Sequence, residues 1–141
     1  MRKGIELVKK AMGGLYHVAE VDLSVESSRD KPHVEFACSG KGFTSQGYFE
    51  DASAVGYDDW KNGARVGVSF ALHIAGQPAA AVVVNRITGL GADTNPTTLA
   101  VAAAQAVWSA LGFVPSDEIA RHLESKMFGS FKPGFNHMPE L

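Results

Sequence analysis

The chain has 141 residues, of which 45% are hydrophobic and 20% are charged, and this composition excludes wholesale disorder. Its formal net charge of −2 gives it no overall attraction to phosphate backbones or to anionic membranes. The length predicts one domain, residues 1–141, which is large enough to bury its own core.

Cysteine content and hydropathy bear on the cellular compartment. The single cysteine, Cys38, excludes an internal disulfide and fits a reducing environment. No apolar segment has the length of a signal-peptide core or approaches that of a membrane span. We therefore expect a cytoplasmic protein with no membrane partner. Because Cys38 closes an apolar segment, we interpret it as a small buried hydrophobe and not as a nucleophile.

Residues 1–14 are compatible with two structures. Their apolar side chains can line one side of a short helix that ends at Gly13 and Gly14, while residues 4–8 can equally begin an edge strand. We favour the helix. The apolar residues concerned are Ile5, Leu7, Val8, Ala11 and Met12. The same segment carries a local basic cluster, which consists of Arg2, Lys3, Lys9 and Lys10.

Two strands are expected next. Residues 16–26 alternate apolar and polar side chains, the period of a strand with one face in water. Residues 33–38 alternate again after a polar, turn-rich connection, so the two segments are expected to form a hairpin. In that hairpin His17 and His33 would face one another, and we interpret both as half-exposed strand histidines.

Residues 41–59 form a long loop with glycines, aromatics and acids but no sustained period, and long ordered loops are often functional. A helix is expected from about residue 60 to residue 75. Its candidate caps are Asp58 and Asp59. Gly63 and Gly67 lie four residues apart on this helix, which predicts a close approach to a neighbouring element.

Residues 80–88 predict a strand that is covered on at least one face. The strand ends at Gly89 and Gly91, which predict a tight left-handed turn. Asn95 can then cap a helix whose first residue is Pro96.

Gly112 ends this helix, and Ser116 caps a further one with an apolar stripe. The resulting order is strand, strand, loop, helix, strand, helix, helix. It predicts an α+β fold: a two-layer sandwich of a small, mainly antiparallel sheet with helices on one face.

This order and the local sequence resemble domain IV of the elongation factor G family of ribosomal translocases, over residues 13–113. The matching segments are residues 13–18, 22–26 with 34–36, 63–67, 80–88 and 93–106. The resemblance implies a fold of the ribosomal protein S5 domain 2-like type with a left-handed β-α-β crossover. Residues 114–141 then add a C-terminal helix and tail.

The resemblance also implies a function, with departures. In the family, two loops form a tip that enters the ribosomal decoding centre. Here the first loop is short and lacks the family's arginine, and residues 89–95 lack its histidine. The chain contains no Gly-x-x-x-x-Gly-Lys-Ser/Thr motif, so it cannot be a translocating GTPase. We expect a small cytoplasmic protein whose tip contacts RNA or the ribosome.

The candidate RNA- or anion-binding residues belong to the two tip loops, the helix start and the nearby basic side chains. Exposed N–H groups at a helix start can hold an anion, and basic side chains can meet phosphates. The residues are Lys9, Lys10, Gly13, Gly14, Arg86, Gly89, Gly91, Asp93, Thr94 and Asn95.

A second hypothesis is a small-molecule-binding protein or an enzyme that uses the 41–59 loop, where acids flank aromatic residues. Its candidate pocket residues are His17, His33, Tyr48, Tyr57, Asp58 and Trp60. No catalytic group is identified, so we favour a protein that is not an enzyme. No histidine pair or Cys-x-x-Cys has metal-ligand spacing, and we expect neither metal nor cofactor. A third hypothesis is a homo-oligomeric assembly module.

Overall fold

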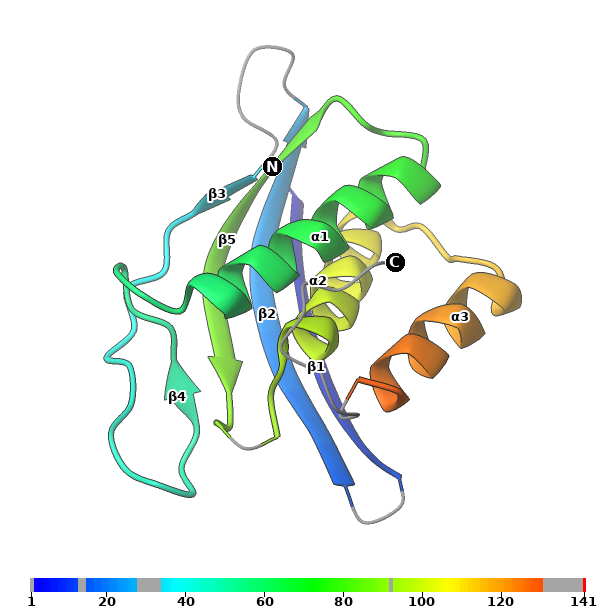
Figure 1. The fold of residues 1–141 in the computed structure, drawn as a ribbon. Coiled ribbons are helices and arrows are strands. Elements are labelled where there is room, and N and C mark those ends of the chain that lie inside the picture. The colour runs from blue at the N-terminus through cyan, green and yellow to red at the C-terminus, as the bar shows by residue number, and fades with distance from the viewer. Residues whose placement is uncertain (1, 13–14, 28–33, 92, 131–140) are drawn as a thin grey trace.

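Five strands form one mixed sheet in the computed structural model, which describes residues 2–12, 15–27, 34–91, 93–130 and 141 (Figure 1). The strands are β1 (Arg2–Met12), β2 (Leu15–Ser27), β3 (Val34–Phe36), β4 (Glu50–Asp51) and β5 (Ala80–Gly89). Their order across the sheet is β1-β2-β5-β3, and the short β4 pairs with the end of β5. All neighbours are antiparallel except β3 and β5, which are parallel.

The helices of the described chain lie on one face of this sheet (Figure 1). They are α1 (Asp58–Ile74), α2 (Pro96–Leu111) and α3 (Asp117–Phe128). Helix α2 lies between the other two and packs on β1 and β2, so it is buried on nearly every side. The expected α+β architecture with helices on one face is confirmed, and the core fills the space between the two layers.

The N-terminal segment is a strand, so the favoured helix is wrong. β1 pairs with β2 along its whole length, from Arg2 opposite Val25 to Met12 opposite Leu15. Gly4 explains how a helix can lie on this strand, because a Cβ built there would lie 1.9 Å from the carbonyl oxygen of Ala106 in α2. Pairing with β2 decided the structure of a segment whose own pattern was ambiguous.

The predicted hairpin between residues 16–26 and 33–38 is also wrong. Both segments contain strands, but β5 lies between β2 and β3, and among the described residues β3 pairs only with β5. The hairpin partner of β2 is β1. His33 lies outside the described residues, so the proposed facing of His17 and His33 has no hairpin to support it.

Most of the predicted helix-boundary residues are confirmed, but the predicted cap of α1 is wrong. The Asn95 side chain accepts a hydrogen bond from the Thr98 N–H at 2.8 Å, and Gly112 ends α2 with φ 67°, both as predicted. Ser116 caps α3 as predicted. Asp58 and Asp59 are not caps, however, because they lie in the first turn of α1.

The residue that precedes α1 is Tyr57, which adopts a left-handed conformation with φ 58° and provides no side-chain cap. The close approach predicted from Gly63 and Gly67 is confirmed. A Cβ on Gly63 would lie 2.4 Å from the carbonyl oxygen of Pro96, and one on Gly67 would lie 2.0 Å from that of Ala100. These two glycines let α1 lie directly against α2.

Cys38 is buried, and its thiol lies 3.9 Å from the carbonyl oxygen of Val84. Burial raises the pKa of this thiol, which confirms Cys38 as a small buried hydrophobe. No helix in the described part of the chain is long and apolar enough to cross a membrane.

Candidate functional site

The turn between β5 and α2 is hydrogen-bonded to Val18 of β2. The Val18 N–H donates to the carbonyl oxygen of Asp93 at 2.9 Å, and the Thr94 hydroxyl donates to the carbonyl oxygen of Val18 at 2.5 Å. The same hydroxyl accepts from the Leu90 N–H at 2.8 Å. These bonds hold the described part of the turn against the end of the sheet.

The glycines of this turn serve a different purpose from the one predicted. Neither Gly89 nor Gly91 has a φ in the left-handed region, so the left-handed turn is wrong. A Cβ on Gly89 would instead lie 2.6 Å from the Thr94 hydroxyl oxygen. Gly89 is therefore needed for close approach, which lets Thr94 fold back over the strand end.

Strand β4 brings the 41–59 loop to the same end of the sheet. Glu50 pairs with Gly89 and Asp51 with Thr88, whose hydroxyl donates to the Asp51 carboxylate at 2.5 Å. Glu50 is only 9% exposed, and its carboxylate accepts a hydrogen bond from the Tyr57 hydroxyl.

The Tyr57 hydroxyl stays protonated and donates its hydrogen bond to Glu50. Burial, followed by the hydrogen bond to Glu50 and the charge of its carboxylate, raises the pKa of Tyr57 to about 12. The hydroxyl therefore keeps its proton at neutral pH. Tyr57 also packs against Trp60, with ring centroids 4.9 Å apart. Of the predicted pocket residues, Tyr57 thus positions Glu50, and neither Tyr57 nor Trp60 lines the cleft beside Glu50.

A cleft of about 540 Å³ opens between the 41–59 loop and the β5–α2 turn. We call it the loop-end cleft. It is lined by Phe43, Ser45, Gln46, Gly47, Tyr48, Glu50, Leu90, Gly91 and Asp93. The structure therefore brings together two regions that the sequence analysis assigned to different hypotheses. These regions are the aromatic 41–59 loop and the predicted tip loop between β5 and α2.

The cleft combines acidic and aromatic groups. Glu50 and Asp93 supply carboxylates, while Phe43 and Tyr48 are 66% and 69% exposed and supply aromatic faces. Among its described lining residues there is no lysine, arginine or histidine. No cluster of three metal-ligating side chains occurs in the described part of the chain. This chemistry suits an organic cation, which carboxylates attract and aromatic faces accommodate.

His17 lies apart from this cleft, and the expectation of a half-exposed histidine is wrong. Its side chain is 1% exposed and packs edge-on against Phe128, with ring centroids 5.3 Å apart. Its Nδ1 lies 3.5 Å from the Thr98 hydroxyl. Burial lowers the pKa of His17, and the charge of Asp93 partly opposes that effect. His17 is therefore a neutral core residue at neutral pH.

The candidate cations near the tip are mostly engaged with carboxylates. Lys10 Nζ lies 2.7 Å from Glu124, and an Arg86 guanidinium nitrogen lies 2.9 Å from Glu20. Lys9 is exposed on the edge strand. Gly13 and Gly14 lie outside the described residues.

The start of α2 is enclosed. Thr94, Asn95 and the first helical residues are buried, and the Asn95 side-chain amide donates to the Ser130 hydroxyl at 2.8 Å. Asn95 also caps the helix, so both its side-chain nitrogen and its side-chain oxygen form hydrogen bonds within the protein. Asp58 is exposed and does not line the loop-end cleft.

Sequence reasoning missed Phe43 and Leu90 as cleft residues. Phe43 carried a usable signal, because a large aromatic residue in a glycine-rich loop is unexpected unless it packs or binds. Leu90 carried none, since only the pairing of β4 with β5 brings its turn to the loop. No known family model matches the chain, and no curated protein sequence matches it.

Proposed function

We propose that this protein is a non-catalytic binding domain that takes an organic cation, an alkylammonium or guanidinium group, in the loop-end cleft. The observation that carries the proposal is the Glu50 carboxylate, which is buried and accepts a hydrogen bond from Tyr57 in the wall of a cleft that also carries Phe43 and Tyr48. This proposal develops the small-molecule hypothesis for the 41–59 loop and keeps the expectation of a cytoplasmic protein.

The physical argument rests on desolvation. A carboxylate shielded from water attracts a cation more strongly than an exposed one does, because the effective dielectric constant is lower. Asp93 adds a second negative charge, and the exposed rings of Phe43 and Tyr48 offer cation–π contacts of about 0.5–1 kcal/mol each. The volume of the cleft falls within the range of small-molecule sites.

Agmatine, which carries a guanidinium and an ammonium group, is a suitable probe. We expect it to bind in isothermal titration calorimetry and to shift the amide resonances of the 43–50 and 90–93 segments. Glu50→Gln, which keeps an acceptor for the Tyr57 hydroxyl, is expected to weaken binding roughly tenfold because a charge-assisted hydrogen bond is lost.

The matched control is Glu35→Gln, because Glu35 is exposed on β3 and lies outside the cleft. It removes the same charge and is expected to leave agmatine affinity unchanged. Tyr48→Ala is expected to weaken binding about threefold through the lost cation–π contact. Equal binding of inorganic phosphate, or equal loss in the two glutamate variants, would contradict the proposal.

A contact with RNA at the same end of the molecule is the second candidate function, and the topology supports it. Strands β3 and β5 are parallel neighbours joined through α1, and α1 and α2 lie on the same face of the sheet (Figure 1). This arrangement is consistent with a left-handed crossover of the ribosomal protein S5 domain 2-like type. The paired state of Lys10 and Arg86, and the carboxylates of the cleft, weigh against phosphate contact.

A short RNA hairpin tests this second candidate. Binding that weakens with salt and is lost in Lys9→Gln/Arg86→Gln would support it, since each phosphate contact releases counterions. If agmatine binds and the hairpin does not, RNA contact is rejected and cation binding remains the proposed function of the cleft.

A further inference from the structure

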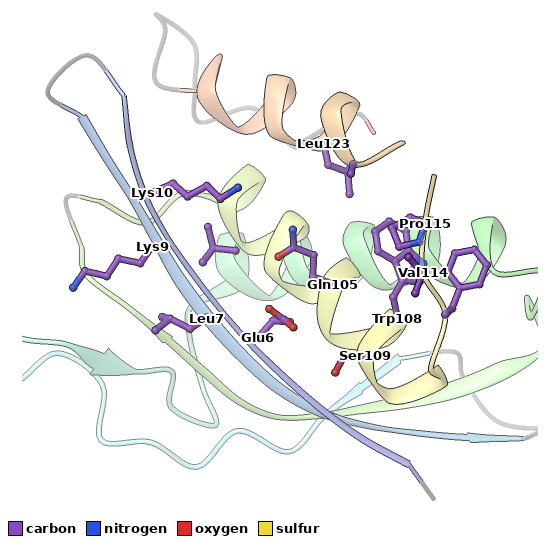
Figure 2. A pocket seen from close by; sticks show the side chains of 13 residues that line it. Glu6, Leu7, Lys9, Lys10, Gln105, Trp108, Ser109, Val114, Pro115 and Leu123 are labelled. Carbon is purple, nitrogen blue, oxygen red and sulfur yellow. The ribbon is translucent and has the colours of Figure 1, made fainter. Parts of the chain in front are cut away.

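A second cavity, of about 640 Å³, lies between β1 and α3 above α2 (Figure 2). We call it the β1–α3 groove. One wall is the continuous run of residues 6–10 on β1. The floor includes Gln105 and Trp108 on α2, and the opposite wall includes Pro115 and Leu123. The groove therefore has a strand edge on one side and apolar side chains on the other.

β1 is an edge strand of the sheet. It pairs with β2 along its full length, and no other strand in the described part of the chain pairs with it. The main-chain N–H and C=O groups of every second residue of such a strand point outward and can accept another strand. Residues 6–10 span about 14–17 Å at the usual rise per residue, which is enough for a short extended segment.

The side chains of β1 alternate between two surroundings. Figure 2 shows Glu6 and Lys10 directed toward α2, and Leu7 and Lys9 directed away from it. Lys10 is bound to Glu124 of α3 and thereby closes one end of the groove. Leu7 is 51% exposed. Lys3 and Lys9 are exposed, and neither belongs to the ion pairs found among the described residues. The outer face of β1 is therefore apolar and basic, while the neighbouring strand β2 places Asp22 and Glu20 beside it.

We propose that the β1–α3 groove binds an extended acidic segment of another protein, which adds a strand to the edge of β1. Main-chain hydrogen bonds to β1 provide the affinity of this mode, and alternate side chains provide its specificity. Apolar side chains of the segment face the partly exposed Phe113 and the 86% exposed Val114, which line the groove. Acidic side chains lie on the other face, beside Lys3 and Lys9.

Charge disfavours one register in which β1 of a second copy could pair with β1. Antiparallel pairing of two β1 strands centred on Glu6 would place Lys3 opposite Lys9 and Arg2 opposite Lys10. Like charges directly opposite one another destabilise a strand pair. An acidic segment places opposite charges at the same positions.

A fluorescein-labelled seven-residue peptide that alternates acidic residues with valine tests the proposal. We expect saturable binding by fluorescence anisotropy at low ionic strength and shifts of the β1 amide resonances. Lys3→Glu/Lys9→Glu, which reverses two exposed charges, is expected to weaken binding roughly tenfold. The control Lys41→Glu/Arg65→Glu makes the same change in net charge at exposed positions outside the groove and is expected to alter affinity less than about twofold.

Two further peptides test the mode of binding without altering the protein. A lysine-for-acid peptide and a peptide with a central proline, which lacks a main-chain donor, are both expected to bind weakly. Equal binding of either peptide would overturn the proposal, as would equal effects of the two double variants. A dimer in sedimentation analysis that excludes the acidic peptide would identify a second copy as the occupant and would also overturn it.

Discussion

The loop-end cleft and the β1–α3 groove differ in how they are built. The cleft consists of residues from the 43–50 segment together with Leu90, Gly91 and Asp93, and only tertiary hydrogen bonds bring these two regions together. The groove consists mainly of regular elements, a strand edge and two helices, together with the short connection between those helices. A cleft made of loops can vary its side chains without disturbing the core, whereas a groove made of regular elements depends on how closely those elements pack.

The two regions also differ in charge. The cleft presents Glu50 and Asp93 and has no basic side chain among its described lining residues. The outer face of β1 presents Lys3 and Lys9, which belong to no ion pair found among the described residues. A net charge of −2 therefore conceals an acidic end and a basic edge. Composition excludes a strong overall field but does not reveal local fields of opposite sign.

The largest expected effect is a loss of protein stability in a variant that alters the β1–α3 groove and leaves the loop-end cleft intact. Gly4→Ala places a Cβ against the carbonyl oxygen of Ala106, beneath α2. We expect the free energy of unfolding to fall by about 1–3 kcal/mol because the helix must move. Binding of the acidic peptide should weaken, while agmatine binding should persist in the folded fraction.

Urea unfolding and the two titrations measure this prediction. Gly129→Ala is the control, since its Cβ would lie 3.4 Å from the nearest atom, the Ser125 carbonyl oxygen, and its φ of −82° suits alanine. Wild-type stability of Gly4→Ala would show that β1 and α2 are not in the contact described above.

The next effect concerns Tyr57, which supports the cleft without lining it. Tyr57→Phe removes a donor from the buried Glu50 carboxylate, so stability at neutral pH should fall by about 1–2 kcal/mol. Because the folded protein raises the pKa of Tyr57 to about 12, its contribution should be lost as the pH rises from about 10 to about 12. Urea unfolding of both proteins at intervals from pH 8 to the alkaline limit measures this, and parallel pH profiles would contradict it.

The smallest effect concerns His17, beneath the end of the sheet. Because burial lowers the pKa of His17 in the folded protein, its contribution is complete above about pH 6.5 and is lost as the pH falls below that value. His17→Gln should therefore flatten the decline of stability below about pH 6.5. His73→Gln, at an exposed position on α1, is expected to leave the decline unchanged. Equal pH profiles for the wild type and His17→Gln would contradict the burial of His17.

Elements with strong local signals could be predicted from the sequence. Asn95, Pro96 and Gly112 determine where α2 begins and ends, because a cap, a preset φ and a left-handed glycine act within a few residues. The alternation of β2 and the apolar run of β5 likewise identified strands without reference to other segments. The acids and aromatic residues of the 41–59 loop identified it as a candidate site, but no local signal distinguished Glu50 as the buried acid.

Only the tertiary structure decided which strands pair and which loops meet. β1 became a strand because β2 offered it an edge, and β3 paired with β5 because α1 carries the chain back beside it. The loop-end cleft exists because two residues of β4 pair with the end of β5, a contact with no local sequence signature. Capping and periodicity act over a few residues and can be seen in the sequence, whereas strand pairing is a choice among distant partners that depends on the whole core.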